Sequence, residues 1–275
     1  MAMVQMPVPT VMPYFTRKHS FVLGLLLGVL LMAHGAPDDS DVVKIGTVYR
    51  LDDMAELAAR LGAPVTYNRF GSLLFADTFE SGLAAWTITV NGVAGSVRPS
   101  NTQSWEGELS VQLVSGTGAA PDSAITKYMP PIADTNIGVQ SAFALDTNLD
   151  YYEMGITCGD GAKRYYYRVR YDHATGTLAY RSGLVAYTVF ATPGTLFDQA
   201  NNFHNMKLVV NNTRKEYIRF YLDNVAYPMT GLGVYQDDLI INPFMSVRFK
   251  VWGDGFLSTT LYLDSFVLTY DEFDS

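Results

Sequence analysis

The sequence has little charge, a single cysteine and no excess of basic residues. Charged residues make up 17% of its 275 residues, and the formal net charge is −8. Binding to nucleic acid through the phosphates needs a basic surface, so this balance argues against nucleic acid as a general partner. Because Cys158 is the only cysteine, an intrachain disulfide is excluded. We expect it to be a small buried side chain in a strand, since nothing in the sequence marks it as a reactive thiol.

Histidine is scarce as well. The four histidines are His19, His34, His173 and His204. They are too far apart for their spacing to indicate a metal-ligand cluster or a Ser-His-Asp arrangement.

The chain also lacks an apolar run of the ~20 residues that a membrane-spanning helix needs. The run Phe21 to Met32 has only 12 residues; Arg17 and Lys18 precede it, and small residues follow it. This pattern is typical of an export signal cleaved before Ala36. If residues 1–35 are retained, they would instead form a hydrophobic arm that docks on a neighbouring subunit or a membrane.

Residues 36–72 are expected to form an N-terminal arm with one short helix. Asp53 and Glu56 have the spacing of a capping box, and Gly62 with Pro64 supplies a stop. The apolar stripe between these signals is Met54, Leu57, Ala58 and Leu61. A stripe this narrow predicts a helix that packs on the main domain, with a clasp between subunits as the alternative.

Aromatic residues and glycine are abundant, with 18 Tyr, 15 Phe and 23 Gly. This composition favours strands and turns over helices. The clearest example is the segment from Phe203 to Tyr227, which alternates with period two on both sides of the polar turn Asn211 to Lys215 and therefore predicts a hairpin. The residues expected to face the core are Met206, Leu208, Val210, Ile218, Phe220 and Leu222. The residues expected to face solvent are Lys207, Tyr217, Arg219 and Tyr221.

Similar runs recur from residue 73 to the end of the chain, separated by turns rich in Gly, Asn, Asp and Pro. Besides the hairpin, the expected strands are Trp86 to Val90, Leu109 to Val114, Ala124 to Met129, Ile137 to Leu145, Tyr151 to Cys158, Arg164 to Tyr171, Thr177 to Arg181, Val185 to Phe190, Phe244 to Trp252 and Thr260 to Tyr270. About a dozen strands at this spacing predict one all-β domain over residues 73–275, a two-sheet antiparallel β-sandwich.

Two stretches resemble a known family. The segment Leu73 to Trp86 contains Asp77-Thr78-Phe79-Glu80-Ser81-Gly82 followed by a tryptophan, and the hairpin begins Phe203-His204 and ends Tyr221-Leu222-Asp223-Asn224. Both patterns resemble concanavalin A-like (laminin G-like) β-sandwich domains, and the resemblance extends over Leu73 to Tyr270. It implies a jelly-roll fold. It leaves the function open, because lectins, glycan-cleaving enzymes, adhesins and virion proteins share this sandwich.

The resemblance also suggests two kinds of site. Glucanases of this fold carry a Glu-x-Asp-x-x-Glu strand that supplies a nucleophile and a general acid; the nearest acidic strand here, Tyr151 to Gly155, has one carboxylate, Glu153. Related jelly-roll modules often hold a structural calcium ion. By resemblance, Asp77, Glu80 and Asp264 would supply its oxygen ligands, whereas the alternative is that they are surface carboxylates near turns.

The middle strands indicate a binding surface. Their apolar residues alternate, which directs the residues between them to the opposite face. The inward set is Tyr152, Met154, Ile156, Cys158, Tyr165, Tyr167, Val169 and Tyr171. The outward set, selected as ligand-binding residues, is Tyr151, Glu153, Arg164, Tyr166, Arg168 and Arg170, with Trp252 joining from a later strand beside Arg248 and Lys250. Aromatic rings stack on sugars, while guanidinium and carboxylate groups bind hydroxyl or acidic substituents. The alternative is that such pairs only stabilise a solvated sheet face.

These observations favour an exported, non-catalytic surface or particle protein that binds a glycan or assembles with copies of itself; an anionic glycan would fit the local arginines. The first alternative is a virion structural or decoration protein without a sugar ligand. The second is a glycan hydrolase or lyase of the same fold.

Overall fold

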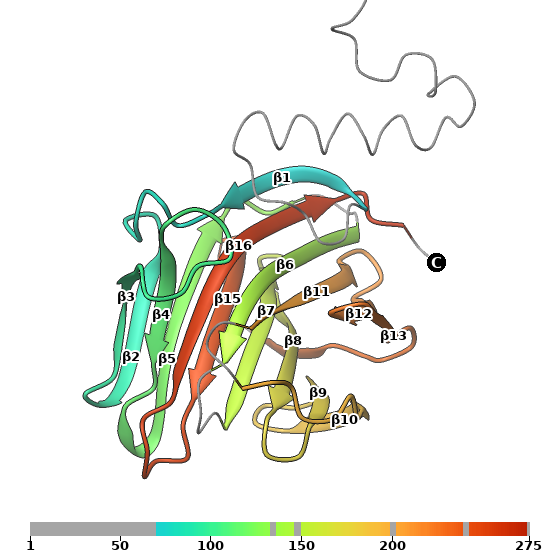
Figure 1. The fold of residues 1–275 in the computed structure, drawn as a ribbon. Helices are drawn as coiled ribbons and strands as arrows, with labels where there is room; N and C mark the ends of the chain where they lie inside the picture. Colours follow the sequence, from blue (N-terminus) through green and yellow to red (C-terminus); the bar gives the residue numbers. More distant parts are fainter. Residues whose placement is uncertain (1–69, 133–135, 146–149, 199–201, 239–241, 274–275) are drawn as a thin grey trace, which may run out of the picture. The chain divides into compact units, whose positions relative to one another are not determined.

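The computed structural model describes residues 70–132, 136–145, 150–198, 202–238 and 242–273. All of them belong to one compact unit of the chain, Met54–Ser275. They form sixteen strands in two antiparallel sheets (Figure 1), and no helix occurs among them, so the described segments include no membrane-spanning helix. The expected export signal, the short helix and nearly all of the N-terminal arm lie outside the described residues.

The first sheet, sheet A, has the strand order β13-β12-β11-β6-β16-β4-β3, and β1 pairs with the other half of β16 on the β4 side. Its strands are β13 (Val225–Pro228), β12 (Glu216–Leu222), β11 (Phe203–Asn211), β6 (Asn136–Leu145), β16 (Thr260–Tyr270), β4 (Ser110–Val114), β3 (Ser96–Ser100) and β1 (Ser72–Asp77). The strand β16 is therefore the element on which the sheet is assembled.

The second sheet, sheet B, has the order β10-β9-β8-β7-β15-β5-β2, with β14 pairing with the first part of β8. Its strands are β10 (Tyr187–Ala191), β9 (Thr177–Arg181), β8 (Lys163–Asp172), β7 (Tyr151–Gly159), β15 (Phe244–Trp252), β5 (Thr117–Met129), β2 (Thr87–Val93) and β14 (Tyr235–Asp238). Consecutive strands β7 to β10 form a meander, and β15 returns from the end of the chain to lie beside β7.

The core lies between the two sheets and is rich in aromatic side chains. Trp86 packs its ring at 5.4, 6.2 and 5.2 Å from the rings of Phe79, Phe249 and Phe266. All four side chains are buried. Burying a side chain of this size stabilises the fold by roughly 1.5–3 kcal/mol. This cluster joins the two sheets, because Phe249 belongs to β15 of sheet B and Phe266 to β16 of sheet A.

The expected sandwich and its twelve strand segments are confirmed, but the hairpin departs from its predicted faces. Tyr217 was expected to face solvent, and that prediction is wrong: its side chain is fully buried in the core. A β-bulge shifts the register after Val209, so Val210 pairs with Tyr217 while Val209 pairs with Arg219. Ile218 is the extra, unpaired residue of the bulge, and because of it Tyr217, which precedes Ile218, faces the opposite way from the prediction.

Lys207 does face away from the core, but it is not solvated as expected. Only 1% of its surface is exposed, because the carboxylate of Glu272 lies 2.6 Å from Nζ and the carbonyl of Phe70 accepts a hydrogen bond from Nζ at 2.9 Å. A buried ammonium group needs such partners. The segment after β16 therefore covers this part of the outer face of sheet A.

Candidate functional site

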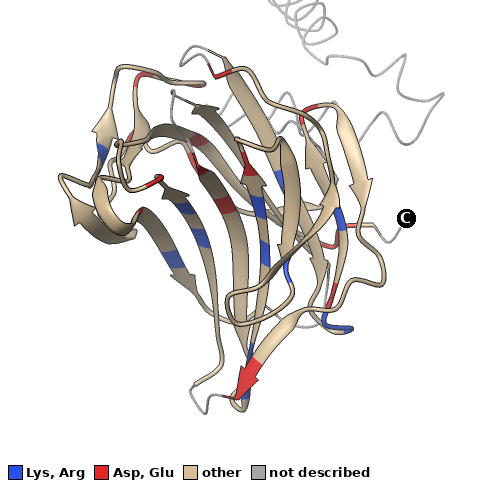
Figure 2. Ribbon diagram, turned by 90° about the horizontal axis from the view of Figure 1, so that it is seen from below, with Lys and Arg blue, Asp and Glu red and all other residues tan. Residues whose placement is uncertain are grey.

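The candidate site is the outward face of sheet B, the side that is turned away from the core. Because side chains alternate along each strand, the register defines rows of outward residues that cross the sheet. Three successive rows across β15, β7 and β8 are Arg248, Gly155 and Arg168; Lys250, Glu153 and Arg170; and Trp252, Tyr151 and Asp172. Figure 2 shows bands of Lys and Arg on neighbouring strands of the sheet, with acidic residues between them.

The sequence-based assignment of faces holds for β7 and β8. The inward set forms part of the hydrophobic core, from Tyr152 and Met154 to Val169 and Tyr171. All seven predicted ligand-binding residues lie on the outward face of sheet B, and Trp252 is directly opposite Tyr151. The structure thus brings these residues together, while their role in binding stays a prediction.

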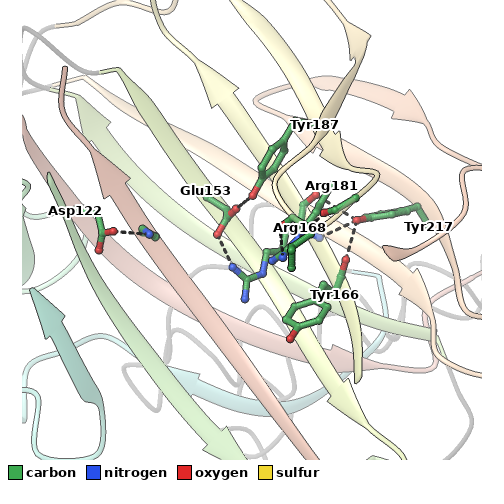
Figure 3. A network of polar contacts seen from close by, with 10 residues as sticks. Asp122, Glu153, Tyr166, Arg168, Arg181, Tyr187 and Tyr217 are labelled. Carbon is green, nitrogen blue, oxygen red and sulfur yellow. Dashed lines mark hydrogen bonds and ion pairs between the residues drawn. The ribbon is translucent and has the colours of Figure 1, made fainter. Parts of the chain in front are cut away.

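Glu153 is the centre of the polar network on this face. It is 1% exposed, and its two oxygens have different partners: Oε1 lies 3.1 Å from Nη1 of Arg168, and Oε2 accepts a hydrogen bond from the hydroxyl of Tyr187 (Figure 3). Burial, followed by the charge of Glu153, raises the pKa of Tyr187 well above its ordinary value, so the phenol stays a donor. The sequence placed Tyr187 in a strand without assigning its face, because β10 is short and only partly buried.

Two further cations on this face lie against aromatic rings. The guanidinium of Arg170 lies 4.1 Å from the ring centre of Tyr151 and 4.3 Å from that of Tyr187. The ammonium of Lys250 is 3.9 Å from the ring centre of Trp252 and 2.6 Å from Asp122 Oδ2. Burial lowers the pKa of Lys250, and the hydrogen bond to Asp122 opposes that change. Asp122, which the sequence did not single out, also accepts a hydrogen bond from Asn91 at 3.0 Å.

Arg164 and Tyr166 differ from the other predicted residues, because their hydrogen-bond donors are already bound to a carboxylate of the protein. Asp237 of β14 receives two hydrogen bonds from Arg164, at 3.0 and 2.6 Å, and one from the Tyr166 hydroxyl at 3.0 Å. The ring of Tyr166 stacks on Tyr235, and Arg181 covers both rings at 4.4 and 4.9 Å. The hydrogen bond from Arg164 is the main cause of a lowered pKa at Asp237. This group closes the β14 end of the face and offers few unused donors.

Tyr217 connects the site to the opposite sheet. Strand β8 pairs with β14 at residues 163–166 and with β9 at residues 169–172, which leaves the backbone between these segments without a neighbour on that side. The Tyr217 hydroxyl fills the gap: it accepts the Arg168 N–H at 2.8 Å and lies 3.2 Å from the carbonyl oxygens of Tyr166 and Arg168, so it can donate to one of them. Burial raises its pKa, which keeps the proton in place. Tyr217 therefore supports the strand that carries Arg168 (Figure 3).

Aromatic pairs lie at both ends of the outward face of β15. At one end the rings of Tyr128 and Phe244 are 6.4 Å apart, and at the other end the rings of Tyr151 and Trp252 are also 6.4 Å apart. Tyr128 is 62% exposed, so it can contact a ligand directly. Strand β15 has nine residues and, at ~3.3 Å per residue, separates the two pairs by about 26 Å.

The three carboxylates proposed for calcium accept hydrogen bonds, mostly from backbone N–H groups. Asp77 accepts the Phe79 N–H and the indole N–H of Trp86, both at 2.8 Å. Glu80 accepts the Glu108 and Leu109 N–H groups, and Asp264 accepts N–H groups from Trp105, Glu106 and Ser265. Within the described segments no group of three His, Cys, Asp or Glu side chains is placed to hold a metal ion. The calcium site stays a prediction without such a group to support it.

The remaining nucleophilic and titratable candidates have structural surroundings. Cys158 is buried, as expected, and burial raises the pKa of its thiol to about 12. His204 is 7% exposed and its Nδ1 lies 2.8 Å from Asp223 Oδ2, while Nε2 is 3.2 Å from the carbonyl oxygen of Phe197. Burial by itself lowers the pKa of His204, but the hydrogen bond and charge of Asp223 outweigh it and raise the pKa. These contacts fix the start of β11.

Comparison with known proteins identifies the fold. No family model and no curated protein matches the sequence. The chain is similar in structure to the cellulose-induced protein Cip1, with a TM-score of 0.51 and 17% identity over 71% of this chain and 97% of that one. It is also similar to an endo-β-1,4-glucuronan lyase from the fungus Trichoderma reesei, with a TM-score of 0.49 and 10% identity over 72% and 95% of the two chains. An identity of 17% bears on architecture alone. Together with the strand order, the likeness to Cip1 shows that this chain has a two-sheet antiparallel β-sandwich fold, the architecture expected from the resemblance to concanavalin A-like domains.

Proposed function

We propose that the protein binds a polysaccharide along the outward face of sheet B, outside the cell, without cleaving it. The observation that carries the proposal is the row of contacts along β15: an aromatic pair at each end and a cluster of hydrogen-bonding cations between them. Rings bind the C–H faces of sugars, and charged donors bind hydroxyl and acidic groups. A length of about 26 Å suits an extended chain rather than a single sugar. The expected export of the chain would bring this face to extracellular polysaccharides.

The positions of the carboxylates favour binding over hydrolysis. A hydrolase needs two carboxyl groups about 5–9.5 Å apart flanking the bond to be broken. The two buried carboxylates of this face are Glu153 and Asp122, and each is paired with a cation, Arg168 and Lys250 respectively. By the register they lie two strands and two residues apart, about 12 Å between Cα atoms. We therefore expect no hydrolysis, which would appear as new reducing ends without unsaturated sugars, when the protein is incubated with a polysaccharide that it binds.

The test is affinity electrophoresis and calorimetry of the full chain against neutral and acidic polysaccharides, comparing Trp252→Ala with Trp105→Ala. Trp252 is an end of the proposed face, whereas Trp105 is 46% exposed beside Phe203 of sheet A and serves as the matched control. Loss of a stacking ring should weaken binding about tenfold or more, equivalent to about 1.4 kcal/mol. The control should bind like the wild type. If no polysaccharide binds, or if both variants bind normally, the proposed function fails. The alternative, a particle protein without a sugar ligand, is then favoured.

A further inference from the structure

The outward face of sheet B has a gap in its middle row, at Gly155. In register, Gly155 of β7 lies between Arg248 of β15 and Arg168 of β8. A Cβ atom at Gly155 would be 2.6 Å from Cγ of Arg168, which is closer than real Cβ contacts come. The side chain of Arg168 therefore lies over the glycine and extends toward the strand that carries Arg248. The absence of one side chain brings two guanidinium-bearing residues together.

The two arginines are unequally neutralised. Arg168 forms an ion pair with Glu153 through one nitrogen, Nη1, which lies 3.1 Å from Oε1. No carboxylate within the described part of the chain forms an ion pair with Arg248, although its neighbour Lys250 is paired with Asp122. Across the three rows and Asp122 beside them, four cations (Arg168, Arg170, Arg248 and Lys250) face three carboxylates (Glu153, Asp122 and Asp172). The middle of the face thus has an excess of positive charge in a protein whose net charge is −8.

Hydrogen-bonding capacity is also unused at this place. The Nε atoms of Arg168, Arg170 and Arg248 are buried and have no hydrogen-bond partner in the described structure. A buried donor without an acceptor is costly, and such groups usually have a reason to be there. Burial and then the charge of Arg168 lower the pKa of Arg248, which shows that the surroundings disfavour the second cation as they stand. An anion between the two side chains would supply a hydrogen-bond acceptor and offset the repulsion between the two cations.

We propose that Arg168 and Arg248 form, across Gly155, a seat for one carboxylate or sulfate group of the bound glycan. This inference rests on the proposed function and narrows it to acidic polysaccharides. Planar guanidinium groups present paired donors that match the two or three oxygens of such an anion. The aromatic rings at the two ends of β15 would then hold neighbouring sugars on either side of the acidic one.

The seat can be tested first with a small probe. The probe is sodium sulfate, compared with sodium chloride at equal ionic strength, and the readout is the melting temperature of the full chain. Sulfate stabilises many proteins by exclusion from their surfaces, so the informative quantity is the difference between variants. The increase in melting temperature in sulfate relative to chloride should be smaller for Arg248→Gln than for the wild type. Arg98→Gln, which removes one positive charge from exposed β3 of sheet A, should show the same increase as the wild type. An equal rise in wild type and Arg248→Gln would overturn the proposal.

The second arm uses polysaccharide pairs that differ only in charge. Polygalacturonate is compared with its methyl ester for the carboxylate, and dextran sulfate with dextran for the sulfate. The wild type should bind the charged member of one pair at least tenfold more tightly, and Arg248→Gln should lose most of that preference. Arg248→Lys, which keeps the charge but not the planar fork, should retain only part of it.

The outcomes separate this inference from the proposed function. If charged and uncharged members bind equally through Trp252 and Arg248→Gln has no effect, the seat is refuted while glycan binding stands. If sulfate stabilisation depends on Arg248 but no glycan binds, the proposed function fails, and the assignment of the seat to a sugar acid falls with it. If Arg248→Gln unfolds, the Arg248→Lys variant still tests the proposal. An equal preference for the charged polysaccharide in Arg248→Lys and in the wild type would contradict recognition by a guanidinium group.

Discussion

The substitution Tyr217→Phe should destabilise the protein through strand β8 although it removes a single oxygen atom. The hydroxyl is fully buried, accepts the Arg168 N–H at 2.8 Å and can donate to a carbonyl at 3.2 Å. Phenylalanine fills the same space but leaves one buried N–H and one carbonyl without a partner, and each such group costs about 1–3 kcal/mol. We expect a loss of about 2–4 kcal/mol in the free energy of unfolding. At roughly 2–4 °C per kcal/mol for a domain of this size, the melting temperature should fall by roughly 5–15 °C.

Urea unfolding measures the loss, and amide hydrogen exchange of Arg168 locates it. The control is Tyr221→Phe on the same strand, because Tyr221 faces outward, is partly exposed and forms no hydrogen bond through its hydroxyl in the described structure. That variant should stay within about 0.5 kcal/mol of the wild type. If Tyr217→Phe unfolds at the same urea concentration as the wild type and protection of the Arg168 amide is unchanged, then water or a backbone shift satisfies these groups, and the Tyr217 hydroxyl does not support β8.

Two further predictions concern pH. Asp223 raises the pKa of His204 above its ordinary value near 6.5, so the stabilisation from this pair is complete below about pH 6.5 and is lost as pH rises through the higher folded pKa. Unfolding free energies of wild type and His204→Gln should therefore converge as pH rises above about 6.5, and a constant difference would contradict the assignment. Burial raises the pKa of Asp264 to about 6, so the folded state holds this proton more tightly than the unfolded state does, and stability falls as pH rises from about 4 to about 6. The wild type should lose stability relative to Asp264→Asn across that interval; parallel pH curves would show that the N–H donors around Asp264 already compensate for its burial.

Much of the candidate site could be predicted from the sequence because it depends on alternation within long strands. Once β7 and β8 are recognised, the period of two sends Glu153, Arg168 and Arg170 to one face, and the structure agrees. The same rule fails at Tyr217, because a bulge adds one residue and no local pattern announces it. Short edge strands were also missed, such as β3 with its Pro99 and the four-residue β14. Their pairing is set by neighbours rather than by their own composition.

The register between strands that are distant in the chain could not be predicted from the sequence. Arg248 was recognised as an outward residue, but its position opposite Gly155, and thus beside Arg168, depends on the pairing of strands about 90 residues apart in the chain. Likewise, Asp77, Glu80 and Asp264 have the chemistry of calcium ligands, and in the structure their oxygens accept hydrogen bonds, mostly from backbone N–H groups. Carboxylates near turns serve either purpose, and only the path of the chain decides between them.

The central place of β16 has a consequence for the order of events during synthesis. This strand joins β6 on one side to β4 and β1 on the other, and it follows every other described strand in the chain. Until β16 has been synthesised, the early strands β1, β3 and β4 cannot pair with the rest of sheet A, and their apolar residues stay exposed to solvent. Such non-local pairing delays folding and prolongs exposure to aggregation. A nascent chain stalled before Thr260 should accordingly depend on chaperones to stay soluble.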